Sequence, residues 1–247
     1  MASFETVVDE YDAARPAYPA ALYDHIETAT GGLVGKLVAD GGAGTGVATR
    51  QLVGRGAEVV AFDPGLAVLS RAVVRTPGLR AVAADGGAIP LRAASLDLLC
   101  YAQSWHWVDQ PPGAAEVARV LRSGGWWAAW WNQAWADGEQ WFEDYYRLLE
   151  ARCPGVSRTQ RDTDWSRDSI AGAGQFESIA QMIVPWVRAV SIEMWMRDQR
   201  SHSYVIALPE PDRGRLLGEA EAILHTGFPD GQMAVAYQCR LWLARRR

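Results

Sequence analysis

The amino-acid sequence predicts an α/β protein built on a doubly wound, mostly parallel β-sheet. Short apolar runs alternate with helical patterns over residues 36–132, as in repeated βαβ units. Most of these runs are almost continuously apolar, which is typical of strands covered on both faces of a parallel sheet. A glycine-rich segment at residues 41–46 follows the first run and predicts a tight turn. With two later runs, the sequence predicts seven strands in all.

The elements of the first half follow from the periodicity of apolar residues. Residues 5–28 are amphipathic but interrupted by Pro16 and Pro19, which predicts a helical lid and not a strand of the sheet. Strands are then predicted at residues 36–40, 58–62, 79–84, 96–101 and 126–131. Helices are predicted at residues 47–54, 66–75 and 114–121, the last ended by a turn at 123–125.

The second half is less regular. Residues 141–151 predict a helix, and residues 153–168, rich in Pro, Gly, Ser, Arg and Asp, predict a loop. Strands are predicted at 176–184 and 234–244, and helices at 192–207 and 212–224. The additional helices predict a cap inserted between strands five and six.

The composition restricts the class of protein. The 247 residues carry a net charge of −5, which argues against a nucleic-acid partner. The three cysteines lack CxxC or Cys/His spacing, so neither disulfides nor a metal site is expected. No signal peptide and no run of about 18 apolar residues is found, so no membrane partner is expected. We therefore expect a cytoplasmic protein, and the strong preference for arginine over lysine indicates a GC-rich bacterial source.

The glycine-rich segment is the most informative feature. Residues 40–46 read DGGAGTG, with Asp40 at the end of the first predicted strand and glycines at Gly42, Gly44 and Gly46. Glycines let the backbone turn tightly and approach a ligand. The dinucleotide pattern GxGxxG fails at its third glycine, and the Walker pattern lacks its Gly-Lys-Ser/Thr. The segment therefore predicts a ligand platform of another kind, with a ligand-free turn as the alternative.

Several motifs together resemble a known family. Residues 40–46 are similar to motif I of class I S-adenosylmethionine-dependent methyltransferases, in particular the ubiquinone-biosynthesis and trans-aconitate methyltransferase group. Residues 11–19 (YDAARPAYP), 102–107 (AQSWHW) and 120–125 (VLRSGG) resemble three further motifs of that group. The chain departs from the pattern at Ser123, where proline is usual, and at Ala43, where cysteine is common. Neither change removes a ligand group.

The resemblance implies S-adenosylmethionine as the cofactor and a Rossmann-like methyltransferase fold in a single domain, 1–247. Its parts would be a lid at 1–35, a cofactor-binding half at 36–132, and a cap and substrate-binding half at 133–247. The implied cofactor residues are Asp40, Gly42, Gly44, Gly46, Asp63, Pro64, Asp85, Gly86 and Gln103.

Three carboxylates have distinct implied roles. Asp40 would hold the methionine ammonium group, Asp63 the ribose hydroxyls, and Asp85 the adenine amino group. Spacing supports Asp63 independently, because it ends the second predicted strand 23 residues after Asp40. The alternatives are helix capping for Asp63 and an ordinary loop aspartate for Asp85.

The acceptor site is predicted from residue type and place. His106 is the candidate catalytic residue, as a base or as a polar group that orients the acceptor, and local packing is its alternative role. No metal ligands are predicted. By the same reasoning, Trp105, Trp107, Trp131 and Asn132 are candidate substrate-binding residues. The resemblance implies six more, which are similar to positions that cover the acceptor in the family: Tyr11, Arg15, Tyr18, Arg200, Ser203 and Tyr204. Core packing and surface helix contacts are the alternatives for these residues.

The sequence thus predicts a methyltransferase that acts on a small molecule, with oxygen as the first choice of acceptor atom and nitrogen or carbon as further choices. A fold relative that binds the cofactor without transferring methyl, such as a ligand-binding or cyclase-like protein, is the alternative from another class. A nucleic-acid methyltransferase is a weaker third. It would need a basic face and an acceptor motif of the Asn/Asp-Pro-Pro-Tyr/Phe type, where this chain has AQSW.

Overall fold

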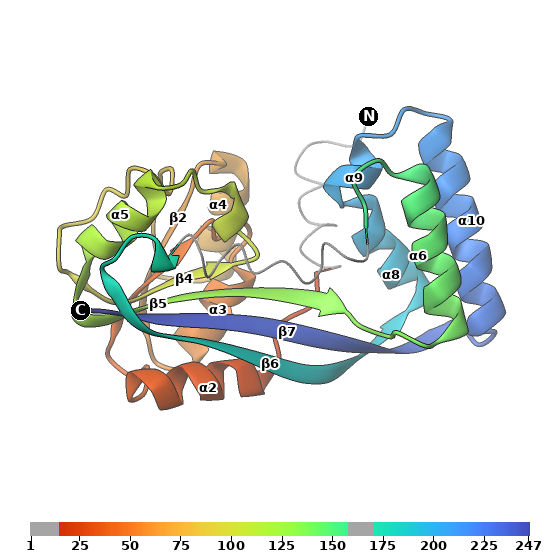
Figure 1. Cartoon of the computed structure of the whole chain (residues 1–247). Helices are drawn as coiled ribbons and strands as arrows, with labels where there is room; N and C mark the ends of the chain where they lie inside the picture. The colour runs from red at the N-terminus through yellow and green to blue at the C-terminus, as the bar shows by residue number, and fades with distance from the viewer. Residues whose placement is uncertain (1–14, 158–169) are drawn as a thin grey trace. The chain divides into compact units, whose positions relative to one another are not determined.

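A computed structural model describes residues 15–157 and 170–247 (Figure 1). The chain divides into two compact units. The first, which we call the helical unit, comprises Met1–Pro16, Gln133–Thr163 and Pro185–Gln238. The second, the sheet unit, comprises Ala17–Asn132, Asp164–Val184 and Cys239–Arg247.

Within the described residues, seven strands form one sheet in the order β3-β2-β1-β4-β5-β7-β6. The strands are β1 (Leu37–Gly41), β2 (Glu58–Asp63), β3 (Arg80–Ala83), β4 (Leu96–Ala102), β5 (Leu121–Ala134), β6 (Phe176–Ser191) and β7 (Gln232–Arg246). The pairs β1–β2, β2–β3, β1–β4 and β4–β5 are parallel. The chain order reverses between β1 and β4, and open α/β sheets bind ligands at the carboxyl ends of the strands beside such a reversal.

The last two strands run antiparallel to their neighbours. The Trp135 amide, just after β5, donates to the Ala236 carbonyl, whereas the Arg246 guanidinium at the other end of β7 donates to the Leu121 carbonyl. Between β6 and β7, Ile192 pairs with Gly231 and Arg247 with Gln175. The sheet is therefore parallel in its first five strands and antiparallel in its last two (Figure 1).

The helices of the sheet unit follow the predicted βαβ alternation. They are α2 (Ala20–Thr30), α3 (Val47–Gly54), α4 (Leu66–Arg75), the 3₁₀ turn η1 (Trp105–Trp107) and α5 (Pro112–Val120). The bounds of α3 and α4 coincide with the prediction. The core of this unit contains Leu99, Tyr101, Trp105 and Trp127, all at most 1% exposed. The Rossmann-like α/β class predicted from the sequence is confirmed.

The helical unit has its own core. Its described helices are α6 (Gln140–Arg152), α8 (Ile192–Arg200), α9 (Ser203–Ile206) and α10 (Asp212–Gly227). Phe142 and Leu224 are fully buried there, and Trp195 is 2% exposed. The cap was predicted between strands five and six, but only α6 lies in that connection among the described helices. The helices α8, α9 and α10 lie between β6 and β7, so the predicted place of the cap was largely wrong.

Three strands differ from their predicted form. The strand β3 was expected to be covered on both faces, yet it forms a sheet edge, and Arg80, Ala81 and Ala83 are exposed. The strand β6 continues through Pro185 to Ser191, because proline is tolerated on an edge strand and β6 is the other edge. The strand β5 begins at Leu121, so the turn expected at 123–125 is an irregularity inside it, where Gly124 has φ +77°.

The structure also bears on the expectations for membrane-spanning helices and for the cysteines. In the described part of the chain, no helix combines the length and the apolar character needed to cross a membrane. Cys100, Cys153 and Cys239 are buried free thiols.

Candidate active site

The glycine loop between β1 and α3 needs its glycines for different reasons. Gly42 has φ +64°, and a Cβ there would lie 2.5 Å from the Ser104 Cβ. Gly46 has φ +82°, and its Cβ would lie 2.9 Å from the Ala72 Cβ. Gly44 has φ +54° but open space around its Cα, with no atom within 4 Å of a built Cβ. Gly44 is thus the loop glycine whose backbone is open to a ligand.

Ser104, two residues after β4, binds the start of the glycine loop through a hydrogen bond. Its hydroxyl donates to the Gly41 carbonyl at 2.6 Å, and the serine is buried. Ser104 was not among the predicted site residues. Ser104 lies in the motif at residues 102–107, but that motif gives no sign of a contact with the glycine loop.

Asp40 is fully buried at the end of β1. Its Oδ2 accepts a hydrogen bond from the Thr49 hydroxyl at 2.5 Å, and its Oδ1 has no hydrogen-bond partner among the described residues. Burial raises the pKa of Asp40 to about 7, the Thr49 hydrogen bond opposes this rise, and the nearby Asp63 charge adds to it. A buried carboxylate oxygen without a partner fits a cationic ligand group such as the ammonium of S-adenosylmethionine.

Asp63, at the end of β2, connects the glycine loop to the turn that opens α4. Its Oδ2 accepts from the Gly44 amide at 2.9 Å, and its Oδ1 accepts from the Gly65 amide at 2.7 Å. The Asp63 side chain is partly buried. Pro64 lies between Asp63 and Gly65 in the turn that opens α4. Each carboxylate oxygen can accept a second hydrogen bond, so ribose hydroxyls and these amides can be bound together.

Asp85 is exposed after β3, and its Oδ1 accepts from the Gly87 amide at 2.7 Å. The neighbouring Gly86 is buried, and a Cβ there would lie 2.7 Å from the Val108 Cγ2. Packing against Val108 therefore accounts for glycine at this position without a ligand.

Gln103 follows β4 in a left-handed conformation, with φ +58°. Its backbone N–H donates to the Trp130 carbonyl at 2.8 Å, and its side-chain Nε2 donates to the Asn132 backbone carbonyl at 3.4 Å. Non-glycine residues in this region are strained and concentrate at functional sites. Gln103 and the buried Asn132 thus lie together at the ends of β4 and β5.

His106 lies in η1 with two of the predicted aromatic residues. Its Nδ1 accepts a hydrogen bond from the Trp131 Nε1 at 3.3 Å. Its ring centroid is 4.9 Å from that of Trp107 and 6.4 Å from that of Trp131. Partial burial lowers the pKa of His106 below its ordinary value.

Trp105, between these residues in the sequence, has a different place. Its side chain is fully buried and its ring packs against Tyr101 at 4.8 Å and Trp127 at 5.3 Å. Trp107, by contrast, is 73% exposed. The structure therefore places Trp105 in the hydrophobic core and not on a substrate-facing surface. Its ring packs against the rings of Tyr101 and Trp127, which leave none of it exposed.

The other predicted substrate residues lie in both units. Tyr18 belongs to the sheet unit, where its backbone forms two hydrogen bonds with the Gln51 side chain, at 3.1 and 2.8 Å, and its ring meets Trp130 edge-on. In the helical unit, Arg200 and Ser203 are exposed and Tyr204 is partly buried. Tyr11 lies outside the described residues.

A buried polar cluster surrounds Asp198 on α8 and includes Arg15 and Tyr204, two of the predicted substrate-binding residues. The Asp198 carboxylate is 3.5 Å from the Arg15 Nε, 3.6 Å from the Arg188 Nη1 and 3.9 Å from the His202 Nε2. Burial raises the pKa of Asp198, although both arginines oppose the rise. The hydroxyls of Tyr145 and Tyr204 donate to the adjacent Gln199. Asp198, Arg188 and His202 were not predicted, because their contacts depend on how separate segments of the helical unit pack.

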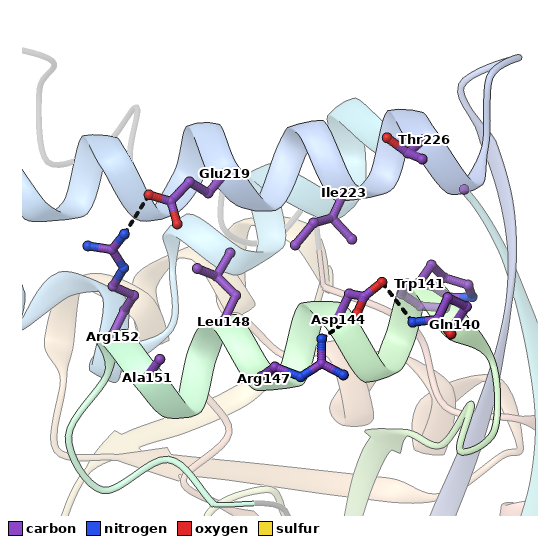
Figure 2. Close-up of a pocket in the computed structure, with 11 residues that line it drawn as sticks. Gln140, Trp141, Asp144, Arg147, Leu148, Ala151, Arg152, Glu219, Ile223 and Thr226 are labelled. Atoms are coloured by element: carbon purple, nitrogen blue, oxygen red, sulfur yellow. Dashed lines mark hydrogen bonds and ion pairs between the residues drawn. The ribbon is translucent and has the colours of Figure 1, made fainter.

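A groove of about 790 Å³ lies between α6 and α10 of the helical unit (Figure 2). Its polar side chains pair with one another, as Arg152 does with Glu219 and Arg147 with Asp144, both at 2.6 Å. None of the sequence-predicted site residues lines it. In the described ranges, no group of three His, Cys, Asp or Glu side chains could hold a metal ion.

Comparisons with known proteins agree with the geometry. The family described as Methyltransferase domain matches residues 39–129. An uncharacterized methyltransferase of Mycobacterium tuberculosis (strain ATCC 25618 / H37Rv) is 33% identical over 227 residues, which are 91% of this chain and 86% of that protein.

Two solved structures have a similar fold. One, assigned as a type II methyltransferase from Anaeromyxobacter dehalogenans, gives a TM-score of 0.68 at 22% identity and covers 94% of this chain and 97% of that chain. Phosphoethanolamine N-methyltransferase 2 of Haemonchus contortus, in complex with S-adenosyl-L-methionine, gives 0.58 at 14% identity and covers 98% of this chain and 57% of that chain. The chain therefore belongs to the class I methyltransferases and uses S-adenosylmethionine as its cofactor.

Proposed function

We propose that this methyltransferase transfers the methyl group to an oxygen atom of a small-molecule acceptor. The observation that carries the proposal is the cluster of His106, Trp107 and Trp131 after β4 and at the end of β5. These strand ends lie on the same edge of the parallel strands as the glycine loop. A histidine between two indoles offers one polar contact on an apolar surface, which suits a small organic acceptor.

The residues of the sheet unit have separate proposed roles in binding the cofactor and in orienting the acceptor. Asp40, Asp63 and Asp85 bind and orient the cofactor, whose sulfonium supplies an electrophilic methyl group. Gly44 leaves room for close approach of the backbone. His106 holds the acceptor atom in line, and the indoles exclude water.

The net charge of −5 supports a small molecule over a nucleic acid. We also propose a cytoplasmic enzyme of bacterial origin, related in its N-terminal motif to the ubiquinone-biosynthesis and trans-aconitate group. The test is transfer of labelled methyl from S-adenosylmethionine in the presence of separated fractions of a bacterial extract. Label in the metabolite fraction is expected, and label only in nucleic acid or protein would contradict the proposal.

The ribose role of Asp63 gives a first prediction. Replacing Asp63 by alanine should weaken binding of S-adenosylhomocysteine by roughly 1.5 to 3 kcal/mol, because charge-assisted hydrogen bonds are lost. Calorimetric titration measures this. Asp24→Ala is the matched control, since Asp24 is an exposed carboxylate of the same unit that pairs with Arg55. Unchanged affinity in the Asp63 variant would reject the ribose assignment.

The lid gives a second prediction. Deleting residues 1–18 removes the Tyr18–Gln51 hydrogen bonds and the Arg15–Asp198 ion pair, but none of the strands that the structure describes. The protein should remain folded and bind S-adenosylhomocysteine, but methyl transfer to the metabolite fraction should fall because water enters and the acceptor is held loosely. Circular dichroism, calorimetry and the labelling assay check the three parts. Full transfer by the truncated protein would exclude a lid.

A further inference from the structure

We infer that the helical unit contains a further binding site, in which the side-chain oxygens of Gln133 and Gln238 accept the two N–H bonds of one uncharged NH₂ group. The ligand class is an amide or an aromatic amine. The residues that the proposed function assigns to the cofactor and the acceptor all belong to the sheet unit, so this site goes beyond that function.

The two glutamine oxygens are unmatched polar atoms. The Oε1 atoms of Gln133 and Gln238 are buried, and neither accepts a hydrogen bond from any described residue. Buried polar atoms are normally paired, because they have lost their hydrogen bonds to water. Exchanging the oxygen and nitrogen of one amide does not by itself supply a partner, since a nitrogen in the same place needs an acceptor. The unmatched pair therefore indicates a donor that a ligand brings.

The register of the sheet brings the two side chains together. The Trp135 amide donates to the Ala236 carbonyl between the antiparallel strands β5 and β7. Gln133 lies two residues before Trp135, and Gln238 lies two residues after Ala236, so the two glutamines are opposite each other. Opposite side chains share one face of a sheet, with Cβ atoms about 5 Å apart. One NH₂ group between the two amides can therefore donate to both oxygens.

The face that carries the glutamines is open, whereas the other face is part of a core. Tyr237 on β7 is 5% exposed and packs in the core of the helical unit, so its neighbour Gln238 points to the opposite face. The Trp186 ring on β6 packs against that of Tyr237 at 5.0 Å. By the same alternation, Pro185 and Val187 share the face of Gln238, and both are exposed, Val187 by 64%. Both glutamines are themselves only partly buried, so a ligand on this face can reach their amides.

The chemistry of this face selects the ligand. Two acceptor oxygens match a group with two donors, whereas a hydroxyl offers only one. Alkylamines are protonated at pH 7, and their charge is bound more strongly by a carboxylate than by a neutral amide oxygen. An NH₂ group that is neutral at this pH is bonded to a carbonyl carbon or to an aromatic ring. Pro185 and Val187 offer apolar surface for such a planar group.

The stability of the ligand-free protein gives the first test. Gln133→Met and Gln238→Met keep the length of the side chain and remove the unmatched oxygen, so each should raise the midpoint of urea unfolding by about 0.5 M. Gln232→Met is the matched control, because Gln232 is an exposed glutamine of the same strand β7, and it should leave the midpoint unchanged. An unchanged or lower midpoint in the first two variants would overturn the inference, since the oxygens would then already be bound by ordered water or by each other.

Ligand binding gives the second test. The probe is benzamide, and N,N-dimethylbenzamide is its control, with the same ring and carbonyl but no N–H. In ¹H–¹⁵N spectra, the side-chain NH₂ signals of Gln133 and Gln238 are identified by their loss in the Met variants. Benzamide should shift both signals, and each Met variant should bind benzamide about 10-fold more weakly or worse. Equal shifts with the dimethyl compound, or no shift of either signal up to the solubility limit of benzamide, would contradict the site.

Discussion

Replacing Asp40 by asparagine is expected to weaken S-adenosylhomocysteine binding by about 100-fold or more. The variant keeps the size of the side chain but removes the buried negative charge. The unpartnered Oδ1 is the atom assigned to the cofactor ammonium, and no other carboxylate oxygen of the described residues is as buried beside the glycine loop. Calorimetric titration at pH 8 measures the loss. Asp97→Asn on β4 is the matched control and should leave binding unchanged.

The same variant is expected to become more stable than the wild type as the pH rises, because the wild type loses stability when Asp40 ionises. The Asp40 pKa is about 7 in the folded protein and about 3.9 in an unfolded chain. The stability contributed by the protonated form is therefore fully present below about pH 4 and lost as pH rises towards 7. Between pH 5 and pH 8, we expect Asp40→Asn to gain about 2 to 3 kcal/mol over the wild type.

Urea unfolding of the ligand-free proteins at the two pH values measures this gain. The cofactor ammonium should favour the ionised carboxylate, so wild-type affinity for S-adenosylhomocysteine should increase over the same pH range. Equal pH dependence of stability in wild type and variant would show that Asp40 does not titrate in this range.

Replacing Asp198 by alanine is expected to destabilise the protein by roughly 3 to 5 kcal/mol. The carboxylate is 5% exposed and lies 3.6 Å from the Arg188 Nη1, whose side chain is 9% exposed. Removing one partner of a buried ion pair leaves the other charge in a poorly solvated place. Urea unfolding measures the loss in free energy of unfolding.

Three further variants identify the cause. Asp144→Ala on α6 removes a carboxylate from an exposed pair with Arg147 and should cost much less stability than Asp198→Ala. The double variant Asp198→Ala with Arg188→Met should be more stable than Asp198→Ala alone, because the buried charge is also removed. With Arg188→Met measured alone as well, a double variant whose loss equals the sum of the Asp198→Ala and Arg188→Met losses would show that the ion pair is not the cause.

Local patterns predicted the elements whose residues carry their own signals. The helices α3 and α4 have apolar periodicity and lie beside glycines, and their bounds are those expected. Exposure of β3 could not be predicted, because its edge position depends on the strand order and not on its apolar residues. The length of β6 escaped prediction for a related reason. Pro185 reads as a strand end, but at a sheet edge its missing N–H disrupts no ladder.

In the candidate site, too, local patterns predicted some residues, and others depend on how distant segments pack. Asp40, Asp63 and the glycine loop were predicted as cofactor residues from the motif I resemblance, with support from spacing for Asp63, and they remain predictions. Thr49 and Ser104, which bond to Asp40 and to Gly41, were missed because these contacts depend on how the helix and β4 pack on β1. Trp105 and Trp107 are two residues apart in one short turn, and only the structure separates the buried ring from the exposed one.

The central claim places the cofactor at the carboxyl ends of β1 and β2 and at the loop after β3. Amide hydrogen exchange with and without S-adenosylhomocysteine tests this most directly. The cofactor product should slow exchange in residues 41–46, 63–65 and 85–87, with no comparable effect along the α6–α10 groove. Protection confined to that groove, or unchanged exchange in the glycine loop at saturating ligand, would contradict the assigned site.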